Sequence, residues 1–341
     1  MAVAYSHISD SQRRTWIIAL LFPLVFAILA YVGVLVYCLV MSEPFSEINT
    51  LAFYPTIISI CASFFWILFT FFRGDRTLLG NANAVQISRE DNIELYRLVE
   101  NLCITRGLPV PTIYVIDDTS LNAFATGRDP QHSSIVVTSG LLEKLSKSEL
   151  QGVIAHELAH IENRDTTLMI IAIAGISFFT RVGEGLLRWA ARSGTSRKSN
   201  NKTTFILFII GLGFMLFGYI IAPILRCAMS RQREYLADAT SSLTTSNPGA
   251  LASALEKIAE NSRVEVLEAH PSMTAMCIES PGGASPSFFN RLSGNYASHP
   301  PIAERIRRLR EMDGQAEGKK VGFQEDTLLN SKRGVTGETP I

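Results

Sequence analysis

Apolar runs alternate with mixed segments along the chain and predict its membrane-associated helices. The first two runs, residues 16–40 and 51–72, are each long enough to cross about 30 Å of hydrocarbon. The fourth run, residues 205–225, is also of spanning length, whereas the third, residues 166–180, is shorter than a usual span. The pattern therefore predicts a transmembrane pair near the N-terminus and a second apolar pair that either spans or re-enters.

The segments between and after these runs have the periodicities of an α+β fold. Residues 87–106 show helical spacing and end at Gly107, which is a typical helix stop. Short runs rich in β-branched residues predict strands at residues 113–116, 122–126 and 135–138. Further helices are predicted at residues 227–243, 247–260 and 299–311.

The composition favours a membrane protein over a soluble one. Of 341 residues, 47% are hydrophobic and only 18% are charged, and the mean hydropathy is +0.21. The 31 basic and 31 acidic residues balance, so charge gives no sign of a nucleic-acid partner. The five cysteines are scattered without a Cys-x-x-Cys pair, which argues against a disulfide framework and fits a reducing compartment.

Charged residues beside the first two apolar runs predict their orientation. Arg13 and Arg14 precede the first run, Arg73 and Arg76 follow the second, and the connection between the runs has two glutamates and no base. Basic residues favour the cytoplasmic side of a membrane. We therefore expect the N-terminus and the segment after Arg76 to be cytoplasmic.

A His-Glu-x-x-His motif lies on a segment with helical spacing. His156 and His160 are four residues apart, so they share one helix face, where two imidazoles can chelate tetrahedral Zn²⁺. Glu157 projects about 100° around the helix, which lets it reach a water beside the metal as a general base. Ser146 and Glu149 form a capping-box pattern that predicts where this helix begins.

A catalytic zinc site needs a third protein ligand and an open position. Glu234, on a predicted helix downstream, is the best candidate, and Glu162 and Asp165 are next. Asp238 lies one turn after Glu234, on the same face, where it is placed to accept a hydrogen bond from a ligating imidazole. The alternative is a solvated helix face with Arg–Glu pairs.

Four motifs occur in a fixed order along the chain: Asn122-Ala123-Phe124-Ala125-Thr126-Gly127, His156-Glu157-Leu158-Ala159-His160-Ile161-Glu162-Asn163-Arg164-Asp165, Arg233-Glu234-Tyr235-Leu236-Ala237-Asp238, and Ser298-His299-Pro300-Pro301 with Arg305. With the apolar segments around them, they resemble the HtpX-type membrane-bound zinc metallopeptidases, gluzincins related to the CAAX prenyl endopeptidases. The resemblance covers nearly the whole chain except its C-terminal tail. It implies one Zn²⁺ per chain, held by His156, His160 and Glu234, with Glu157 as the catalytic base.

The resemblance also implies where the protein works and on what. It points to a multi-pass endopeptidase of the bacterial cytoplasmic (inner) membrane, in contact with the lipid bilayer. Its catalytic domain would lie on the cytoplasmic side and cleave polypeptides, above all damaged membrane proteins. Two alternatives stay open: a CAAX-type processing protease acting on lipidated C-termini, and a non-catalytic membrane scaffold whose zinc is structural. Glu157 argues against the scaffold, because a structural site needs no base.

Two further roles are predicted for parts of the motifs. An extended peptide could pair with the edge of the 122–126 strand and lie over the zinc. A plain edge strand explains the same pattern. His299 is placed to donate to the developing oxyanion, with Arg305 orienting or supplementing it. A histidine that caps a proline-started helix is the alternative.

Pattern and motifs together predict a mainly α membrane protein, with four apolar helices and a zincin-like α+β catalytic domain that has a small sheet. Its parts are residues 1–76, an N-terminal transmembrane hairpin; 77–165, the first part of the catalytic domain; 166–226, a second transmembrane or re-entrant hairpin; 227–312, the second part of the catalytic domain; and 313–341, a disordered tail.

The second hairpin presents a conflict between two signals. His156, His160 and Glu234 must lie on one side of the membrane, so the third and fourth apolar runs either both cross or both do not. Crossing places six basic residues outside, against the usual charge bias: Arg181, Arg188, Arg192, Arg197, Lys198 and Lys202. We predict a spanning pair, with these residues at the outer headgroups and with Arg181 and Arg188 snorkelling.

Overall fold

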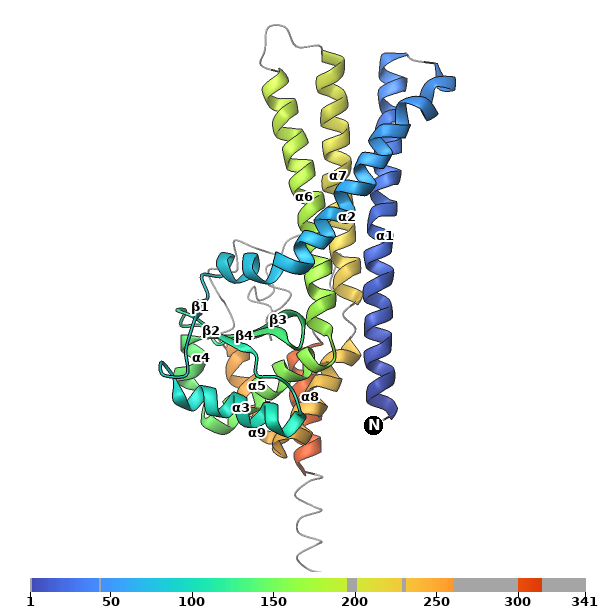
Figure 1. Cartoon of the computed structure of the whole chain (residues 1–341). Helices are drawn as coiled ribbons and strands as arrows, with labels where there is room; N and C mark the ends of the chain where they lie inside the picture. The colour runs from blue at the N-terminus through green and yellow to red at the C-terminus, as the bar shows by residue number, and fades with distance from the viewer. Residues whose placement is uncertain (1, 43, 195–200, 229–230, 261–299, 315–341) are drawn as a thin grey trace, which may run out of the picture.

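Four long helices and a compact helix–sheet unit make up the computed structural model, which describes residues 2–42, 44–194, 201–228, 231–260 and 300–314 (Figure 1). The long helices are α1 (Ala2–Met41), α2 (Ile48–Asn81), α6 (Asp165–Gly194) and α7 (Asn201–Ala228). Helices α1, α6 and α7 run side by side, and α2 crosses them diagonally before it turns towards the sheet. A 3₁₀ turn, η1 (Phe45–Glu47), joins α1 to α2.

The structure confirms two of the four predicted apolar helices as candidate membrane spans. Leu20–Met41 in α1 and the whole of α2 are long and apolar enough to cross a membrane, judged by length and composition. The described apolar stretch of α7, Thr204–Phe217, is shorter than a span, and α6 carries charges in its second half. Four apolar helices are therefore not confirmed within the described residues.

Aromatic side chains fix the bundle of long helices. Phe22 and Phe26 of α1 pack with Phe179 of α6 and Phe214 of α7 in a buried cluster. The rings of Phe26 and Phe179 are stacked with centroids 4.5 Å apart, and Phe26 lies 5.7 Å from Phe214. These contacts determine how α1, α6 and α7 are positioned along one another's axes.

The sheet has four strands in the order β1-β2-β4-β3. Strand β2 (Thr112–Ile116) pairs antiparallel with β1 (Val85–Gln86) and parallel with β4 (His132–Thr138). Strand β3 (Ala123–Asp129) pairs antiparallel with β4 and ends the described sheet. The strand predicted at residues 122–126 is present, but it begins at Ala123 and continues beyond Gly127 to Asp129.

The two faces of the sheet pack against different parts of the molecule. One face, which includes Ala125 and Ile135, joins the main core with α3 (Ile93–Arg106) and α5 (Lys147–Glu162). The other face, which includes Phe124 and Val136, packs on Leu78 and Leu79 near the end of α2. The sheet thus separates the layer that contains α5 from the end of the second long helix.

Helices α8 (Arg231–Thr245) and α9 (Pro248–Glu260) pack against α5, as does the start of the helix at residues 302–314. The Ser241 hydroxyl donates to the Gly152 carbonyl at 2.7 Å. A Cβ at Gly152 would lie 3.2 Å from the Leu251 backbone, so any larger residue would have to push α9 outward by a few tenths of an ångström. Helix α4 (Ser139–Lys144) leads into α5.

Three helices begin later than predicted: α8 at Arg231 instead of residue 227, the last described helix at residue 302 instead of 299, and α3, which differs most. A helix is predicted from residue 87, but α3 begins at Ile93, where Asn92 caps it by accepting from the Leu95 amide. Residues 85 and 86 instead pair with β2, and the Ile87 amide bonds to the Ile113 carbonyl. Backbone pairing with the sheet therefore prevails over the apolar periodicity of this short segment.

Candidate metal centre

Helix α5 presents both histidines of the motif on one face. The helix begins with the predicted capping box, in which Ser146 and Glu149 satisfy each other's backbone amides. Its register puts His156 and His160 side by side, with their Nε2 atoms 3.2 Å apart. His156 is fully buried, and the His160 side chain is 16% exposed.

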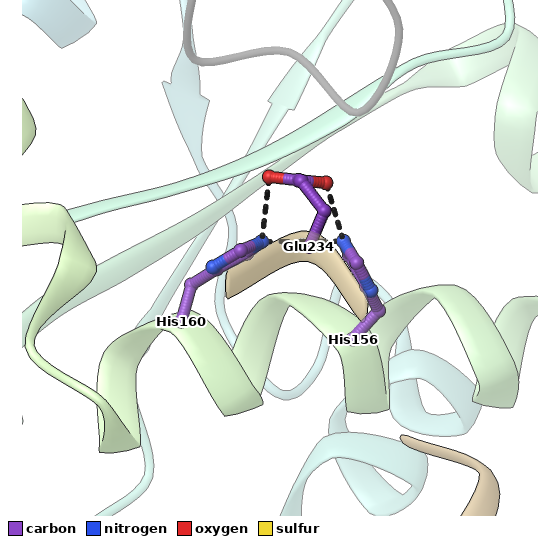
Figure 2. Close-up of side chains that lie close together, drawn as sticks. All are labelled: His156, His160 and Glu234. Carbon is purple, nitrogen blue, oxygen red and sulfur yellow. Dashed lines mark hydrogen bonds and ion pairs between the residues drawn. The ribbon is translucent and has the colours of Figure 1, made fainter. Parts of the chain in front are cut away.

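Glu234 of α8 faces the two imidazoles (Figure 2). One carboxylate oxygen lies 3.7 Å from His156 Nε2 and the other lies 3.7 Å from His160 Nε2. One donor atom from each residue can be chosen so that all three lie within 4.8 Å of one another. Glu234 is therefore the third member of the group, as predicted, and comes from a different helix.

The two imidazole donors are spaced as a tetrahedral metal ion requires. Two ligands about 2.0–2.1 Å from a tetrahedral zinc are about 3.3 Å from each other. The Nε2 separation of 3.2 Å is close to this value. In addition, the Nδ1 atom of each imidazole faces a carboxylate, so in the neutral tautomer both Nε2 lone pairs point into the same space.

A carboxylate and an arginine support His156. Its Nδ1 lies 3.0 Å from Asp238 Oδ1. Arg305, which is fully buried, donates to both oxygens of Asp238 at 2.7 and 2.9 Å. Burial raises the pKa of Asp238, but the Arg305 guanidinium and the His156 hydrogen bond outweigh it and hold that pKa at about 2. Asp238 therefore stays a carboxylate that can orient the imidazole.

A second carboxylate–arginine pair supports His160. Its Nδ1 lies 3.1 Å from Asp165 Oδ2, and Arg233 donates to the other oxygen of Asp165 at 2.6 Å. Burial lowers the pKa of His160, but the Asp165 hydrogen bond and the charges of Glu234, Asp165 and Glu157 raise it to about 9. These surroundings stabilise positive charge at the centre.

The formal charges of this cluster match a divalent cation. Glu157, Glu234, Asp165 and Asp238 are buried and contribute four negative charges, whereas Arg233 and Arg305 contribute two positive charges. Two negative charges remain when both histidines are neutral. Buried charge needs compensation, and two imidazoles with one carboxylate are a donor set that zinc accepts. The residues therefore fit a bound Zn²⁺.

The other predicted residues have different positions. Glu157 is 2% exposed and follows His156 on α5. Residues 122–126 are buried beside α5 and α6, in the edge strand and the residue before it. Arg305 lies inside the cluster, with Nη1 3.5 Å from Glu234. His299 lies outside the described residues.

Sequence reasoning did not assign the roles of Asp165 and Arg233. The sequence offers Asp165 only as a substitute third ligand, but in the structure it contacts His160 on the side away from Glu234. The signal was present in the chain, because Arg233 immediately precedes Glu234 in the motif that resembles the HtpX type.

Comparison with known proteins places the chain in a family. The model of Peptidase family M48 matches residues 89–313, which include all members of the cluster. The chain belongs to peptidase family M48. It is 36% identical to a protein named Protease HtpX homolog from Bacteroides fragilis, over 89% of this chain and 97% of the relative. A protein of the same name from Tropheryma whipplei is 43% identical over 78% of this chain and 87% of the relative.

The M48 family and these HtpX relatives confirm the resemblance seen in the motifs and support protease function. A crystal structure of S. mikatae Ste24p is also similar, with 18% sequence identity and a TM-score of 0.44. That match covers 87% of this chain and 66% of the Ste24p chain.

Proposed function

We propose that this M48 protein is a zinc-dependent endopeptidase that cleaves damaged membrane proteins at the cytoplasmic face of the bacterial inner membrane. The observation that carries the proposal is the convergence of His156, His160 and Glu234 beside the buried Glu157. The match to a peptidase family and the two candidate spans, α1 and α2, support it.

His156, His160 and Glu234 would hold the zinc. When bound, zinc would act as a Lewis acid and bring the pKa of a neighbouring water towards about 7. Asp238 and Asp165 would keep the two imidazoles in the tautomer and orientation that binding needs. Arg305 and Arg233 would hold those carboxylates in place.

Glu157 would move the proton during peptide hydrolysis. It is buried next to His156 but on a different side of α5, so it can approach the attacking water without binding the metal. It would take a proton from that water as the water attacks the carbonyl carbon, and then deliver it to the leaving nitrogen. His299 remains the proposed donor to the oxyanion.

Strand β3 would hold the substrate in an extended form. It ends the described sheet and contacts α5, the helix that carries His156 and His160. A peptide that added to this edge would gain main-chain hydrogen bonds without a demand for particular side chains. Such recognition suits an enzyme that acts on many unfolded sequences.

The test compares two variants of the purified full-length protein. Glu157→Gln should keep close to one zinc per chain and lower proteolysis of casein by at least about 10²-fold, since it removes the base and leaves the ligands intact. Glu234→Ala should lose both zinc and activity. Metal analysis and peptide release are measured on the same samples.

Two results would contradict these assignments. Loss of zinc from Glu157→Gln would show that Glu157 is a ligand and not a base. Full zinc binding by Glu234→Ala would place the third ligand elsewhere.

A further inference from the structure

One face of α6 carries charged side chains that the metal centre does not use. Arg181, Glu184 and Arg188 are exposed on this face, and Gly185 lies among them. Arg188 and Glu184 form an ion pair at 3.0 Å, with side chains 66% and 52% exposed. We call these four residues the α6 polar face. Gly183 and Leu186, by contrast, contact α7.

The α6 polar face is level with the middle of α1. Phe179 stacks on Phe26, and Leu186 packs against Gly211, whose neighbour Ile210 packs against Gly33. Residues 179 and 186 of α6 therefore lie at about the same heights along the bundle as residues 26 and 33 of α1, seven residues apart in each helix. Arg181 and Glu184 lie within this interval.

The depth of these charges follows from the span of α1. The apolar stretch Leu20–Met41 extends six residues below Phe26 and eight above Gly33, or about 9 Å and about 12 Å. Arg181 therefore lies about 20 Å below the level of Met41, beyond the reach of an arginine side chain. This geometry places Arg181 too deep for the predicted snorkelling to the outer headgroups.

The charges of Arg181 and Glu184 at this depth need a covering other than lipid. Ionisable residues inside a bilayer usually face a partner, a water-filled cavity or the interior of a bundle. Yet Arg181, Glu184 and Arg188 are exposed, and in the upper part of Figure 1 α6 lies at the edge of the bundle. The face is therefore suited to contact something that this chain does not itself supply within its described residues.

Gly185 makes the same face open to close approach. A Cβ added at Gly185 would have no heavy atom within 4 Å, whereas one at Gly183 would meet Met215 at 2.8 Å. Small residues between helices let their backbones come close in a membrane. Gly185 therefore provides a gap, flanked by charged side chains, that fits a second helix.

We propose that the α6 polar face docks a transmembrane helix of the substrate that carries an acidic residue. This inference rests on the proposed function and names the class of substrate. Two arginines and one glutamate give the face a net positive charge, which complements a carboxylate that is costly in lipid. A second copy of this chain would bring like charges to the same level, because two α6 helices related by an axis along the membrane normal run parallel.

The face also leads towards the proposed peptide-binding strand. Thr167 lies about four helical turns before Arg181, on the same face of α6. The Thr167 hydroxyl donates to the Arg128 carbonyl at the end of β3 at 2.7 Å. A substrate helix held on the α6 polar face would therefore emerge on the side of α6 that contacts the end of β3.

The experiment uses the full-length protein in liposomes with three casein probes. One is soluble, one is fused to a leucine-rich transmembrane helix, and one to the same helix with a central aspartate. The wild type should cleave the aspartate-anchored probe on the order of tenfold faster than the leucine-anchored one. The double variant Arg181→Leu/Arg188→Leu should lose this preference and cleave soluble casein at the wild-type rate.

A variant at Gly185 tests whether docking depends on the gap at this glycine, separately from the charges of the two arginines. Gly185→Leu should slow cleavage of the aspartate-anchored probe by a similar factor without affecting soluble casein. Gly213→Leu on α7 is the matched control, because a Cβ there also has no heavy atom within 4 Å, and it should behave as wild type.

The possible results distinguish failure of the proposed protease function from failure of the proposed docking surface. No zinc-dependent cleavage of soluble casein by the wild type would overturn the proposed function and the docking surface with it. Equal cleavage of both anchored probes, with soluble casein still cut, would overturn the docking surface alone. A wild-type dimer that Gly185→Leu dissociates would assign the face to a second copy and would also overturn it.

Discussion

At the residue scale, the candidate metal centre contains two matching sets of three side chains. His156 contacts Asp238, which Arg305 holds, and His160 contacts Asp165, which Arg233 holds. Both sets use α5 and α8; Arg305 of the helix at residues 302–314 completes the first set, and Asp165 of α6 completes the second. The orientation of each imidazole therefore depends on a carboxylate and, through it, on an arginine.

We predict that Arg233→Ala weakens zinc binding about 10–100-fold, which is typical for loss of a group that supports a metal ligand. The reason is that Asp165 loses its 2.6 Å partner and no longer fixes His160. Arg233→Lys should recover part of the affinity because it retains the charge. The measurement is competition with a chelator, together with the visible spectrum of the Co²⁺-substituted protein, which reports ligand geometry.

Arg106→Ala is the matched control for that measurement. Arg106 forms a two-pronged ion pair with Glu162 near the same end of α5, but the pair does not include a histidine. Its loss should leave zinc affinity and the Co²⁺ spectrum unchanged. Equal effects of Arg106→Ala and Arg233→Ala would mean that both act only on general stability.

The clustering of His156, His160 and Glu234 could be predicted from residue types and spacing, whereas the carboxylates and arginines around it could be predicted only in part. The i and i+4 histidines have one helical geometry, so their convergence follows directly. Asp238 follows from its place one turn after Glu234. The pairing of Asp165 with Arg233 joins the first residue of α6 to α8, and the sequence does not state which distant charges meet.

At the element scale, the start of α5 is stabilised by charge. Lys257 donates to Glu149 at 2.7 Å, and Glu149 also accepts from the Ser146 amide. Burial raises the pKa of Glu149, but the hydrogen bonds from Lys257 and Ser146 outweigh it and hold that pKa below its ordinary value of 4.5. The folded state therefore favours the ionised form of the Glu149 carboxyl.

The lowered pKa of Glu149 predicts how the stability of the fold changes with pH. A carboxyl whose pKa is lower in the folded state stabilises the protein above its unfolded pKa, and the effect is lost as pH falls through the folded pKa. The melting temperature of Glu149→Gln should therefore be below wild type at pH 7, and the two should converge below about pH 4. Glu143→Gln, at an exposed position of α4, should match wild type throughout. A constant gap between Glu149→Gln and wild type would contradict the charge argument.

Local sequence patterns predict some helix boundaries but not others. The capping box fixed the predicted start of α5, and α9 begins at Pro248 as predicted. The third apolar run ends at residue 180, but α6 continues to Gly194. Arg181 and Glu184 interrupt the apolar run without interrupting the helix, because they lie on one face while Gly183 and Leu186 pack on α7. The turn before α6 also has Arg164 at φ 62°, a conformation not expected for arginine.

At the scale of the whole molecule, the second hairpin decides the topology. Helices α6 and α7 stand beside α1 and share its aromatic cluster. We therefore keep the prediction that both cross the membrane. Ser196→Cys, with the five native cysteines replaced, should react with a membrane-impermeant thiol reagent in intact cells. Protection until the cells are opened would instead favour a cytoplasmic or re-entrant hairpin.

The kinds of element were predictable, but their arrangement was not. Apolar length and motif order predict long apolar helices and a helix–sheet unit, and the structure has both. The strand order, in which β4 lies between β2 and β3, depends on long-range pairing that short β-branched runs do not specify. The crossing of α2 over α6 at Gly74, where a Cβ would meet Ile170 at 3.1 Å, is likewise a tertiary feature.

The placement of α6 and α7 between His160 and Glu234 has a consequence for biosynthesis. The ribosome makes both histidines and Glu157 before the hairpin, and it makes Glu234 and Arg233 only after it. On the proposed ligand set, a nascent chain that has not yet emerged past α7 lacks the carboxylate that completes the metal group. On that ligand set, the metal group is expected to form only after the whole hairpin has been synthesised, so proteolytic activity would begin late in translation.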